Sequence, residues 1–265
     1  MSILIPGCRG VMQLPPPPLI VNADSFDFDG VNDYAYVPHA TDFNFNNGSN
    51  DVAASFAFWV KPKTGYTKAY CMAKNASYTT GEWWIRIDPT DGVWFRLIDT
   101  SVGSAGDTRM NIKGGTITTN TWNHVVVTYD GSAVNTGMEI YVNGSIVASP
   151  TRSNDGGTYS MTQSNSDQIH VGKVTTIYSP MYIDEMYIWK GAELSAAEVS
   201  YIYGQYAAGI SPNLKQDYLA YTSAAYLVGG WTLNNGSGDF ADVTTNNRTM
   251  IRNGGSISSD IPPPP

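Results

Sequence analysis

The sequence predicts an all-β protein built as a sandwich or jelly roll. Charged residues make up only 14% of the 265 residues, whereas glycine (26) and tyrosine (17) are frequent. This composition is typical of short strands joined by tight turns. The segments 56–60, 122–129 and 182–189 alternate apolar and polar residues with a period of two, which is the pattern of strands with one buried face. Hydrophobic residues reach 42%, so a sizeable core can form.

Residues 1–24 are predicted to be a proline-rich arm that precedes the first strand. Within it, Leu14–Leu19 encloses a run of prolines that cannot donate backbone hydrogen bonds and favours polyproline II geometry. A second proline run ends the chain at 262–265. Such ends are either solvated spacers or extended straps that lie on a partner. The apolar residues of the arm favour a strap, because free tails are rarely so apolar.

Two hairpins are predicted inside the β region. Asn143-Gly144 suits a two-residue type I′ turn between two apolar strands, because that turn needs a positive φ at both positions. In the second hairpin, over 83–97, Trp83, Ile85 and Ile87 are expected to face the core.

The other face of the 83–97 hairpin has a different character. The expected register pairs Arg86 with Trp94 and Trp84 with Arg96. These are two reciprocal cross-strand cation–π pairs, each worth roughly 0.5–1 kcal/mol if exposed.

One helix is predicted over 194–203. Ser195 occupies the N-cap position and Glu198 follows three residues later, which is the spacing of a capping box. Gly204 is expected to end the helix, since glycine readily adopts the left-handed conformation there. The remaining stretch, 207–265, is predicted to be a linker and a small C-terminal β extension that ends in the proline-rich tail.

Charge and cysteine content narrow the class of protein. The net charge of −8 argues against nucleic acid as a partner, because few cations are available to replace the counterions of phosphates. The N-terminus has no basic region or apolar run of a signal peptide, and no stretch is long enough for membrane insertion. Cys8 and Cys71 show no CxxC spacing and are predicted to be free thiols, with Cys71 buried.

Four segments occur in a characteristic order along the chain. They are Phe28–Tyr34, Phe58–Lys61, Trp122–Gly144 and Ile183–Trp189, the last of which leads into the helix. Together they resemble the laminin-G-like branch of the concanavalin A-like lectin/glucanase family over about residues 25–205. The resemblance implies a concanavalin A-like, two-sheet antiparallel jelly-roll sandwich, predicted here as a domain over 25–206.

The C-terminal part carries a second resemblance. Leu227–Trp231, Asp242–Asn247 and Ser259–Pro262 are similar to a segment that often follows such domains in virion proteins of marine bacteriophages. The typical segment there has an Asp-Ser-Ser-Gly-Asn-like turn and an Asp-Val-Pro ending. This chain departs from it, because Thr244-Thr245 replace Ser-Gly in the turn and Asp260-Ile261-Pro262 replaces the ending. The resemblance implies a context, not a chemistry.

Catalytic carboxyl groups are not recognisable. Related glucanases carry a Glu-x-Asp-x-x-Glu strand, and this chain has no such motif. Glycoside hydrolysis needs two carboxyl groups that flank the scissile bond. Glu139 is isolated, and Asp184 and Glu185, as strand neighbours, are expected to point to opposite faces. We therefore expect that the protein is not an enzyme.

The three histidines, His39, His124 and His170, have no metal-ligand spacing. His124 alternates with valines in a strand and is predicted to be a packed structural residue. No serine or cysteine lies in a recognisable nucleophile motif.

The resemblance also implies one calcium site. In related folds an ion lies where the first and last strands adjoin, held by an aspartate of the closing strand and carbonyl groups of the opening one. The matching positions are Asp184 with Asp29 and Gly30. The alternative is that Asp184 hydrogen-bonds a neighbouring loop.

Carbohydrate binding is the common non-enzymatic role in the family. Trp84 and Trp94 can supply stacking faces, and Arg86 and Arg96 planar polar groups. The alternative is a surface whose groups satisfy one another, or one that residues 218–265 cover.

Two functions are expected from these observations. The first is a bacteriophage virion structural protein, a capsid decoration or head/tail fibre component on the particle surface. Its terminal arms would anchor it to other virion proteins and to further copies of itself. The alternative is a carbohydrate-binding adhesin or lectin that recognises host-surface glycans.

Overall fold

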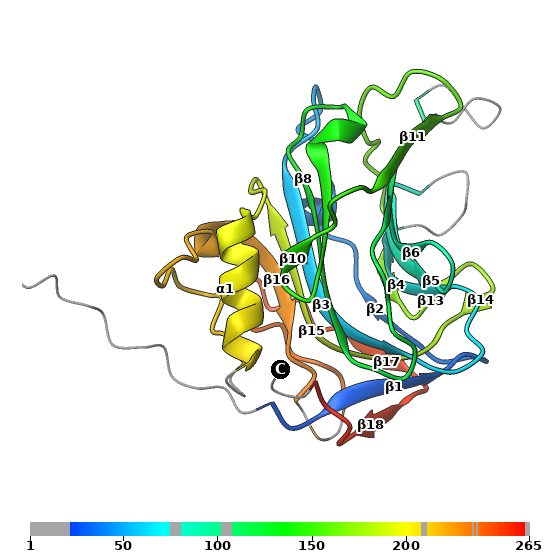
Figure 1. The fold of residues 1–265 in the computed structure, drawn as a ribbon, viewed down its shortest axis with the longest axis vertical. Coiled ribbons are helices and arrows are strands. Elements are labelled where there is room, and N and C mark those ends of the chain that lie inside the picture. The colour runs from blue at the N-terminus through cyan, green and yellow to red at the C-terminus, as the bar shows by residue number, and fades with distance from the viewer. Residues whose placement is uncertain are drawn as a thin grey trace, which may run out of the picture.

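The computed structural model describes residues 22–74, 81–101, 108–207, 211–234, 236 and 238–262. They form two antiparallel sheets packed face to face, with an α-helix on the outer side of the first sheet (Figure 1). The predicted antiparallel two-sheet sandwich with one helix is confirmed. Most of the predicted arm, including Cys8, and the last three prolines lie outside the described residues.

The first sheet has the strand order β10-β9-β8-β3-β15-β1-β18, and β16 pairs with β15 beside this path. Its strands are β1 (Ser25–Asp29), β3 (Ala54–Pro62), β8 (Asn123–Tyr129), β9 (Met138–Val142), β10 (Ser145–Ile146), β15 (Pro180–Lys190), β16 (Leu227–Trp231) and β18 (Ser256–Ser258). The long β15 pairs with β3 along one edge. Its other edge is shared, because β1 pairs with its first half and β16 with its second.

The second sheet has the order β11-β7-β6-β5-β4-β12-β2-β17. Its strands are β2 (Tyr34–Val37), β4 (Ala69–Lys74), β5 (Trp83–Asp88), β6 (Gly92–Asp99), β7 (Thr108–Gly114), β11 (Thr151–Asp155), β12 (Ile169–Val171) and β17 (Ile251–Asn253). A short ribbon of β13 (Lys173–Val174) and β14 (Ile177–Tyr178) follows β12. Short 3-10 turns occur at Thr41–Phe43, Asn135–Gly137 and Ala224–Tyr226.

The core fills the space between the two sheets. Phe56 of β3 is fully buried, with its ring centroid 4.7 Å from that of Trp83 and 5.5 Å from that of Phe95. These partners belong to the second sheet, so the inward faces predicted from alternation meet as expected. Burial of one such side chain stabilises the fold by roughly 1.5–3 kcal/mol.

The helix α1 (Ala196–Ala207) begins with the predicted capping box. The Ser195 amide donates to Oε2 of Glu198 at 2.9 Å, and the Glu198 amide donates to Oγ of Ser195 at 3.3 Å. The predicted end at Gly204 is wrong, because the helix continues to Ala207. Tyr206 is buried against the first sheet, and this packing outweighs the cost of about 1 kcal/mol for an internal glycine. Among the described residues, no helix has the length and apolar character needed to cross a membrane.

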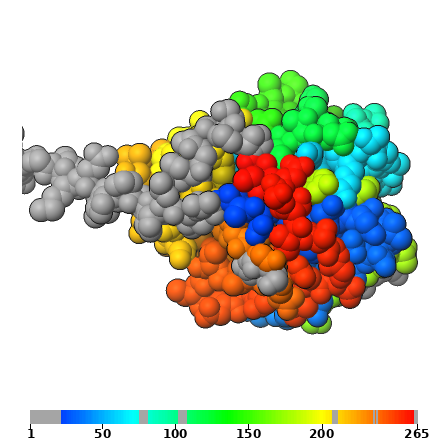
Figure 2. Space-filling model, turned by 90° about the horizontal axis from the view of Figure 1, so that it is seen from below, coloured from blue at the N-terminus to red at the C-terminus, as the bar shows by residue number. Residues whose placement is uncertain are grey.

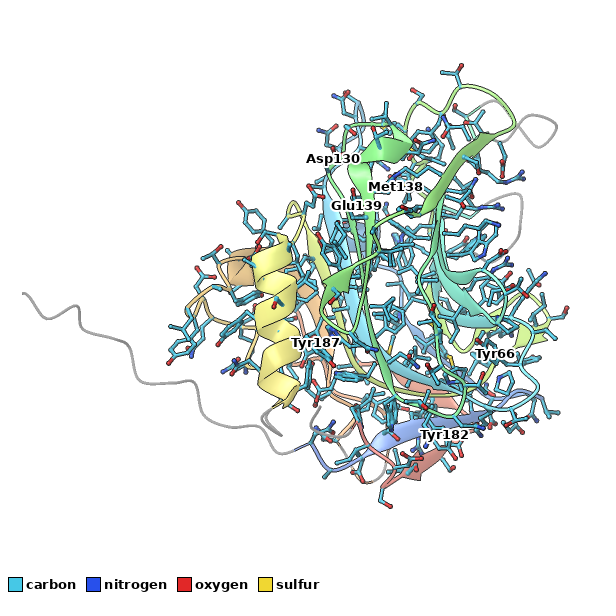
Figure 3. The ribbon with its side chains drawn as sticks, viewed as in Figure 1. Tyr66, Asp130, Met138, Glu139, Tyr182 and Tyr187 are labelled. Carbon is cyan, nitrogen blue, oxygen red and sulfur yellow. The ribbon has the colours of Figure 1, made fainter. Side chains whose placement is uncertain are left out.

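A second, smaller cluster lies between α1 and the outer face of the first sheet. Figure 3 shows Tyr187 of β15 between the sheet and the helix. The cluster includes Trp59, Val126, Tyr187 and Trp189 from the sheet and Val199, Ile202 and Tyr206 from the helix. The first sheet is therefore covered on both faces.

The Asn143-Gly144 turn is confirmed. Asn143 has φ +50° and Gly144 φ +76°, and the flanking residues pair as Val142–Ser145 and Tyr141–Ile146. Positive φ at both central positions is what the type I′ turn requires.

The C-terminal residues complete both sheets. β16 and β18 extend the first sheet, and β17 pairs with β2 in the second. Figure 2 shows the C-terminal residues in red beside the blue N-terminal ones. Trp231, Phe240 and Met250 belong to the main core. The predicted small extension is therefore an integral part of the sandwich, although its sequence alone has no strong strand pattern.

Candidate functional site

The β5–β6 hairpin places the four predicted ligand-binding residues on the outer face of the second sheet. Arg86 pairs with Trp94 and Trp84 with Arg96, as the sequence predicted. The opposite face of this hairpin is part of the core. The four side chains therefore project away from the first sheet.

Cations and indole rings alternate across this face. The Trp94 ring lies between Arg86 on β5, with 4.8 Å from the guanidinium carbon to the ring centroid, and Lys113 on β7, at 4.6 Å from Nζ. The Trp84 ring lies 4.7 Å from Arg96 and 5.1 Å from Arg86. We call these residues, with Tyr70 beside Arg86, the aromatic–cation surface: Tyr70, Trp84, Arg86, Trp94, Arg96 and Lys113.

The members of this surface differ in exposure. Trp84 is only 3% exposed, because it packs with Tyr70, Ile98 and Val174 of the β13 segment. Trp94, Arg86 and Arg96 are partly exposed. Trp84 thus supports the surface from beneath, and Trp94 is the indole within reach of a ligand. Within the described ranges, the hydrophobic cluster around Trp84 contains no residue of 218–265, and β17 joins this sheet at its edge, beyond β4, β12 and β2. The described part of 218–265 therefore lies away from this face.

Carboxylates hold the cations in place. Asp91 pairs with Nζ of Lys113 at 3.0 Å and accepts a hydrogen bond from Nε1 of Trp94 at 3.2 Å. Asp155 pairs with Arg96 at 3.4 Å. These contacts agree in part with the alternative that the polar groups of this surface satisfy one another. Asp155 is exposed, however, and Arg96 stays partly exposed to solvent.

Charge is concentrated around Arg96. Burial, together with the charges of the neighbouring Arg109 and Arg86, lowers its pKa to about 10 against the opposing effect of Asp155. Nε of Arg96 also donates to Oδ1 of Asn111 at 2.5 Å. Because the cations repel one another, an anionic group that approaches this face would relieve the repulsion.

A second aromatic group on the same face was missed from the sequence. Tyr36 pairs with His170, which in turn pairs with Ala73 on the outer face of β4. Beside them, Nζ of Lys173 lies 4.2 Å from the centroid of the Tyr34 ring and 5.2 Å from that of Tyr178. The alternation of Tyr34 and Tyr36 was a usable signal, but their neighbours depend on strand pairings far apart in the chain.

A small pocket on another part of the molecule is a weaker candidate. It has a volume of about 100 Å³ and is lined by Lys215, Ala224, Leu227, Thr244 and Thr245. Pockets for small molecules usually measure about 300–1,000 Å³. A ligand of glycan size therefore fits the open sheet face better.

The predicted calcium ligands are not brought together. Asp29 pairs with Pro180, four residues before Asp184 along β15, which is a separation of about 13 Å at 3.3 Å per residue. The Asp29 carboxylate accepts hydrogen bonds from the amides of Val31 and Asn32 and is exposed. Asp184 accepts a hydrogen bond from Nδ2 of Asn22 at 2.8 Å. The residues 29, 30 and 184 therefore do not form one ligand set, and within the described ranges no group of three acidic, histidine or cysteine residues could hold a metal.

Asp184 and Glu185 also differ from the prediction that they point to opposite faces. Asp184 pairs with Trp59 and Tyr187 with Ala57, so two residues of β15 oppose the single Phe58 between them. This β-bulge gives Glu185 a φ of +49° and directs it to the outer side, where the partners of Asp184 and Tyr187 also lie. A regular strand alternation fails here because of the extra residue.

Glu185 is enclosed by hydroxyl groups. It accepts hydrogen bonds from the hydroxyls of Tyr187 at 2.5 Å, Ser211 at 2.8 Å and Tyr206 at 3.2 Å. Burial raises its pKa to about 7 despite these bonds, and burial, with the charge of Glu185, raises the pKa of Asp184 as well. Both carboxyl groups are buried among the described residues, Glu185 beneath Tyr206 of α1 and Asp184 beside Asn22.

His124 and Cys71 are packed structural residues. His124 is buried between Trp59, Tyr203 and Tyr206, and burial lowers its pKa to about 3, which confirms the predicted packed histidine. Cys71 is a buried free thiol, as predicted, and burial raises its pKa.

A family model for the concanavalin A-like lectin/glucanases superfamily matches residues 29–200. The chain belongs to this family. The match confirms the resemblance drawn from the four segments and extends over most of the sandwich. A comparison with curated proteins gives no match.

Three solved structures match this chain at low identity, one of them with a TM-score above 0.5. A proposed carbohydrate-binding protein of Bacteroides ovatus matches with a TM-score of 0.58 and 17% identity, over 92% of this chain and 62% of the other. This chain thus spans less than two thirds of that protein. A heptameric pentraxin of Limulus polyphemus matches with a TM-score of 0.45 and 14% identity, over 70% and 84% of the two chains. Domain 4 of an arabinanase from Geobacillus stearothermophilus, solved with arabinotriose, has a TM-score of 0.36 and 18% identity, over 57% and 66%.

Proposed function

We propose that this protein binds carbohydrate through the aromatic–cation surface. The observation that carries the proposal is the alternation of Arg86, Trp94 and Lys113 across three neighbouring strands of a lectin-family sandwich. Aromatic faces and edges take up the apolar side of a sugar, and fixed cations fix its orientation. The proposed carbohydrate-binding protein of Bacteroides ovatus, which shares the fold, supports this direction.

The surface favours acidic glycans. Two cations, Arg86 at 4.8 Å and Lys113 at 4.6 Å, lie over the Trp94 ring, so a neutral sugar competes with them for the ring. A carboxylate or sulfate of a glycan can instead bond to Arg96 or Lys113, which are held by partly exposed carboxylates. The residues of this surface come from four neighbouring strands, β4 to β7, and such a span suits an extended polysaccharide and not a single small sugar.

A glycan array that contains neutral and acidic bacterial polysaccharides tests the proposal. We expect the wild type to bind acidic members, and Trp94→Ala and Lys113→Ala to lose at least tenfold in affinity. Tyr226→Ala is the matched control, since Tyr226 is 46% exposed but lies outside this surface. Equal loss in the control, or no binding by a folded wild type, would contradict the proposal.

We propose further that the module acts without catalysis and on a phage particle. The lack of catalysis is supported by the enclosure of Glu185 by three hydroxyl groups. The virion context rests on the resemblance of residues 227–262 to phage virion proteins and on the apolar proline-rich arm. Because 227–258 contributes strands to the sandwich, anchoring to neighbours falls to the N-terminal arm and to the prolines at 262–265.

Light scattering tests the role of the arm. The full chain is compared with a chain that lacks residues 1–21, which keeps the hydrogen bond from Asn22 to Asp184. We expect an oligomer that falls to a monomer on deletion. Monomers in both samples would remove the anchoring role and leave the carbohydrate proposal intact.

A further inference from the structure

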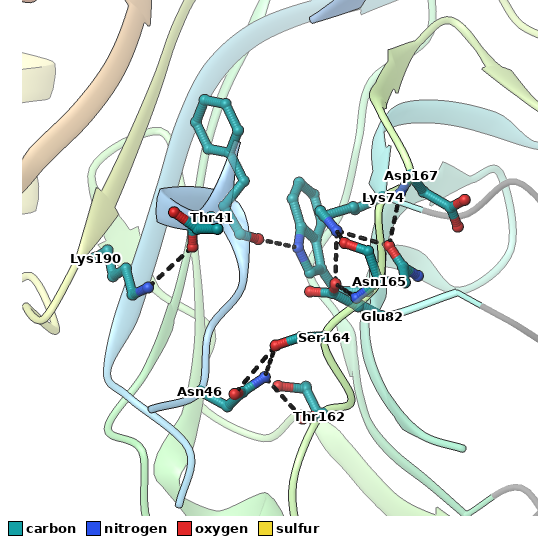
Figure 4. A network of polar contacts seen from close by, with 11 residues as sticks. Thr41, Asn46, Lys74, Glu82, Thr162, Ser164, Asn165, Asp167 and Lys190 are labelled. Carbon is teal, nitrogen blue, oxygen red and sulfur yellow. Dashed lines mark hydrogen bonds and ion pairs between the residues drawn. The ribbon is translucent and has the colours of Figure 1, made fainter. Parts of the chain in front are cut away.

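Three polar side chains that the glycan proposal does not use meet at one end of the second sheet. Lys74 ends β4, Glu82 precedes β5, and Asn165 lies in the connection between β11 and β12 (Figure 4). The side chains of Lys74 and Glu82 are both 0% exposed. Burial of a charged lysine costs free energy unless the amine is paired or neutral.

The contacts bring an amine, a carboxyl group and a carboxamide together. Nζ of Lys74 lies 2.5 Å from Oε1 of Glu82 and 2.6 Å from Oδ1 of Asn165. The backbone amide of Asp167 donates to the same Oδ1 at 2.9 Å. The backbone amide of Asn165 donates to Oε1 of Glu82 at 2.6 Å. The amine therefore lies beside a carbonyl group that a second donor already polarises.

We propose that Lys74 and Asn165 form an intramolecular amide cross-link, with Glu82 as the proton carrier. The reaction needs no cofactor or oxidant. It is a self-modification of the folded chain, distinct from glycan binding at the opposite, solvent-exposed face of the sheet.

The protonation states favour this reaction. An amine attacks a carbonyl group only in its neutral form. Burial lowers the pKa of Lys74 and raises the pKa of Glu82 to about 7. The attraction between the two groups opposes both shifts, and the charge of Asp167 raises both pKa values. A proton that moves from the amine to the carboxylate leaves a neutral pair, which a buried site tolerates better than two ions.

The bonds and protons balance as follows. The neutral Nζ attacks Cγ of Asn165 and forms the new C–N bond, while the amide of Asp167 stabilises the negative charge that develops on Oδ1. The protonated Glu82 gives its proton to the carboxamide nitrogen, the old C–N bond breaks and ammonia leaves. Glu82 then takes the surplus proton from Nζ and is again protonated.

Glu82 has an atom available for this second proton movement. Its Oε2 is buried and has no hydrogen-bond partner among the described residues. Asn165 is only partly buried, so the ammonia formed there has a route to solvent. An unsatisfied buried carboxyl oxygen is unusual in a structural ion pair and fits an oxygen that exchanges protons.

The cross-link would join residues 91 positions apart in the sequence. It would tie the end of β4 to the loop that leads into β12, where the two strands share only a short pairing at His170 and Ala73. A covalent bond there closes a long loop and restricts the unfolded chain.

The test is the intact mass of the full-length protein after purification. We expect a mass lower than the sequence mass by one molecule of ammonia. Tryptic digestion should give one branched peptide in which residues 69–86 are joined to 153–173, because trypsin cannot cut at an acylated Lys74. The branched peptide separates the cross-link from a cyclised asparagine, which also loses ammonia but leaves Lys74 free to be cut.

Four variants complete the test. Lys74→Arg and Asn165→Ala should show their full sequence masses, and Glu82→Gln, nearly equal in shape, should remain folded but stay unlinked. Lys63→Arg is the control, since its ion pair with Asp27 lies elsewhere and the cross-link should persist. A wild type at full sequence mass, or one that is cut at Lys74, would overturn the proposal. A cross-link at full yield in Glu82→Gln would overturn the part assigned to Glu82.

Discussion

The hydroxyl of Tyr206, near the end of α1, donates a hydrogen bond of 3.2 Å to Oε2 of Glu185 in the β-bulge of β15. A helix is thereby attached to a sheet through a carboxyl group that is 1% exposed. The free-energy cost of this buried contact depends on the charge of Glu185, because a buried carboxylate is far more costly than a neutral carboxyl group.

The fold should therefore be more stable at pH 5 than at pH 7.5. Burial raises the pKa of Glu185 from 4.5 to about 7, so the folded state binds more protons than the unfolded state in this range and stability falls as pH rises. The loss is on the order of a few kcal/mol, at about 1.36 kcal/mol per unit. Thermal unfolding across this range measures it. The pH slope should shrink in Glu185→Gln, and an unchanged slope in that variant would assign the effect to other groups, such as Glu82.

Glu198 should contribute more than an ordinary helix cap. Besides Ser195, its carboxylate accepts a hydrogen bond of 2.6 Å from the Ser223 hydroxyl and one of 3.1 Å from the Thr222 amide. We expect Ser195→Ala to cost about 1 kcal/mol and Glu198→Ala about 2–3 kcal/mol in urea unfolding, because the second change also leaves buried donors unpaired. Equal costs would show that the contacts to 222–223 add nothing.

The Asn143-Gly144 turn offers a matched pair of glycine variants. A Cβ at Gly144 would lie 2.6 Å from the Tyr203 ring, whereas one at Gly48 would meet nothing within 4 Å. Both glycines have positive φ, so Gly48→Ala should show the backbone strain alone, about 1–2 kcal/mol. Gly144→Ala should lose roughly 1–3 kcal/mol more through the clash. Similar melting temperatures for the two variants would contradict the close packing of α1 on the hairpin.

Removal of the C-terminal strands should prevent folding. A chain that ends at residue 226 lacks Trp231, Phe240 and Met250, all at most 1% exposed in the main core. The loss of a buried aromatic side chain costs about 3–5 kcal/mol, and a domain has only about 5–15 kcal/mol in total. Circular dichroism and protease digestion report the outcome. A chain that ends at residue 262 is the control and should fold, and a folded short chain would show that 227–262 is dispensable.

Local patterns in the sequence predicted local structure well. The registers of the 83–97 and 138–148 hairpins and the Ser195–Glu198 cap depend on residues close in the chain, and all three are confirmed. The end of α1 was missed because Tyr206 finds its packing partners on a distant sheet.

The candidate site was only half visible for the same reason. Trp84 and Trp94 were recognisable because they lie on the same face of a predicted hairpin. Lys113 joins them only through the pairing of β6 with β7, and Val174 packs on Trp84 from a segment far along the chain. Glu185 shows the converse limit. The two-residue alternation of a strand is interrupted wherever a β-bulge adds a residue, and no residue type around Glu185 indicates the bulge in advance.

The pairing of the chain's first described strand with its last has a consequence for biosynthesis. Ser25 pairs with Ser258, and Tyr34 of β2 with Asn253. β1 and β2 thus receive these neighbours only after more than 200 further residues have been made. Such distant pairings fold slowly, and an edge that waits unpaired can join another chain. The edges of β1 and β2 therefore stay open to other chains until β17 and β18 have been made.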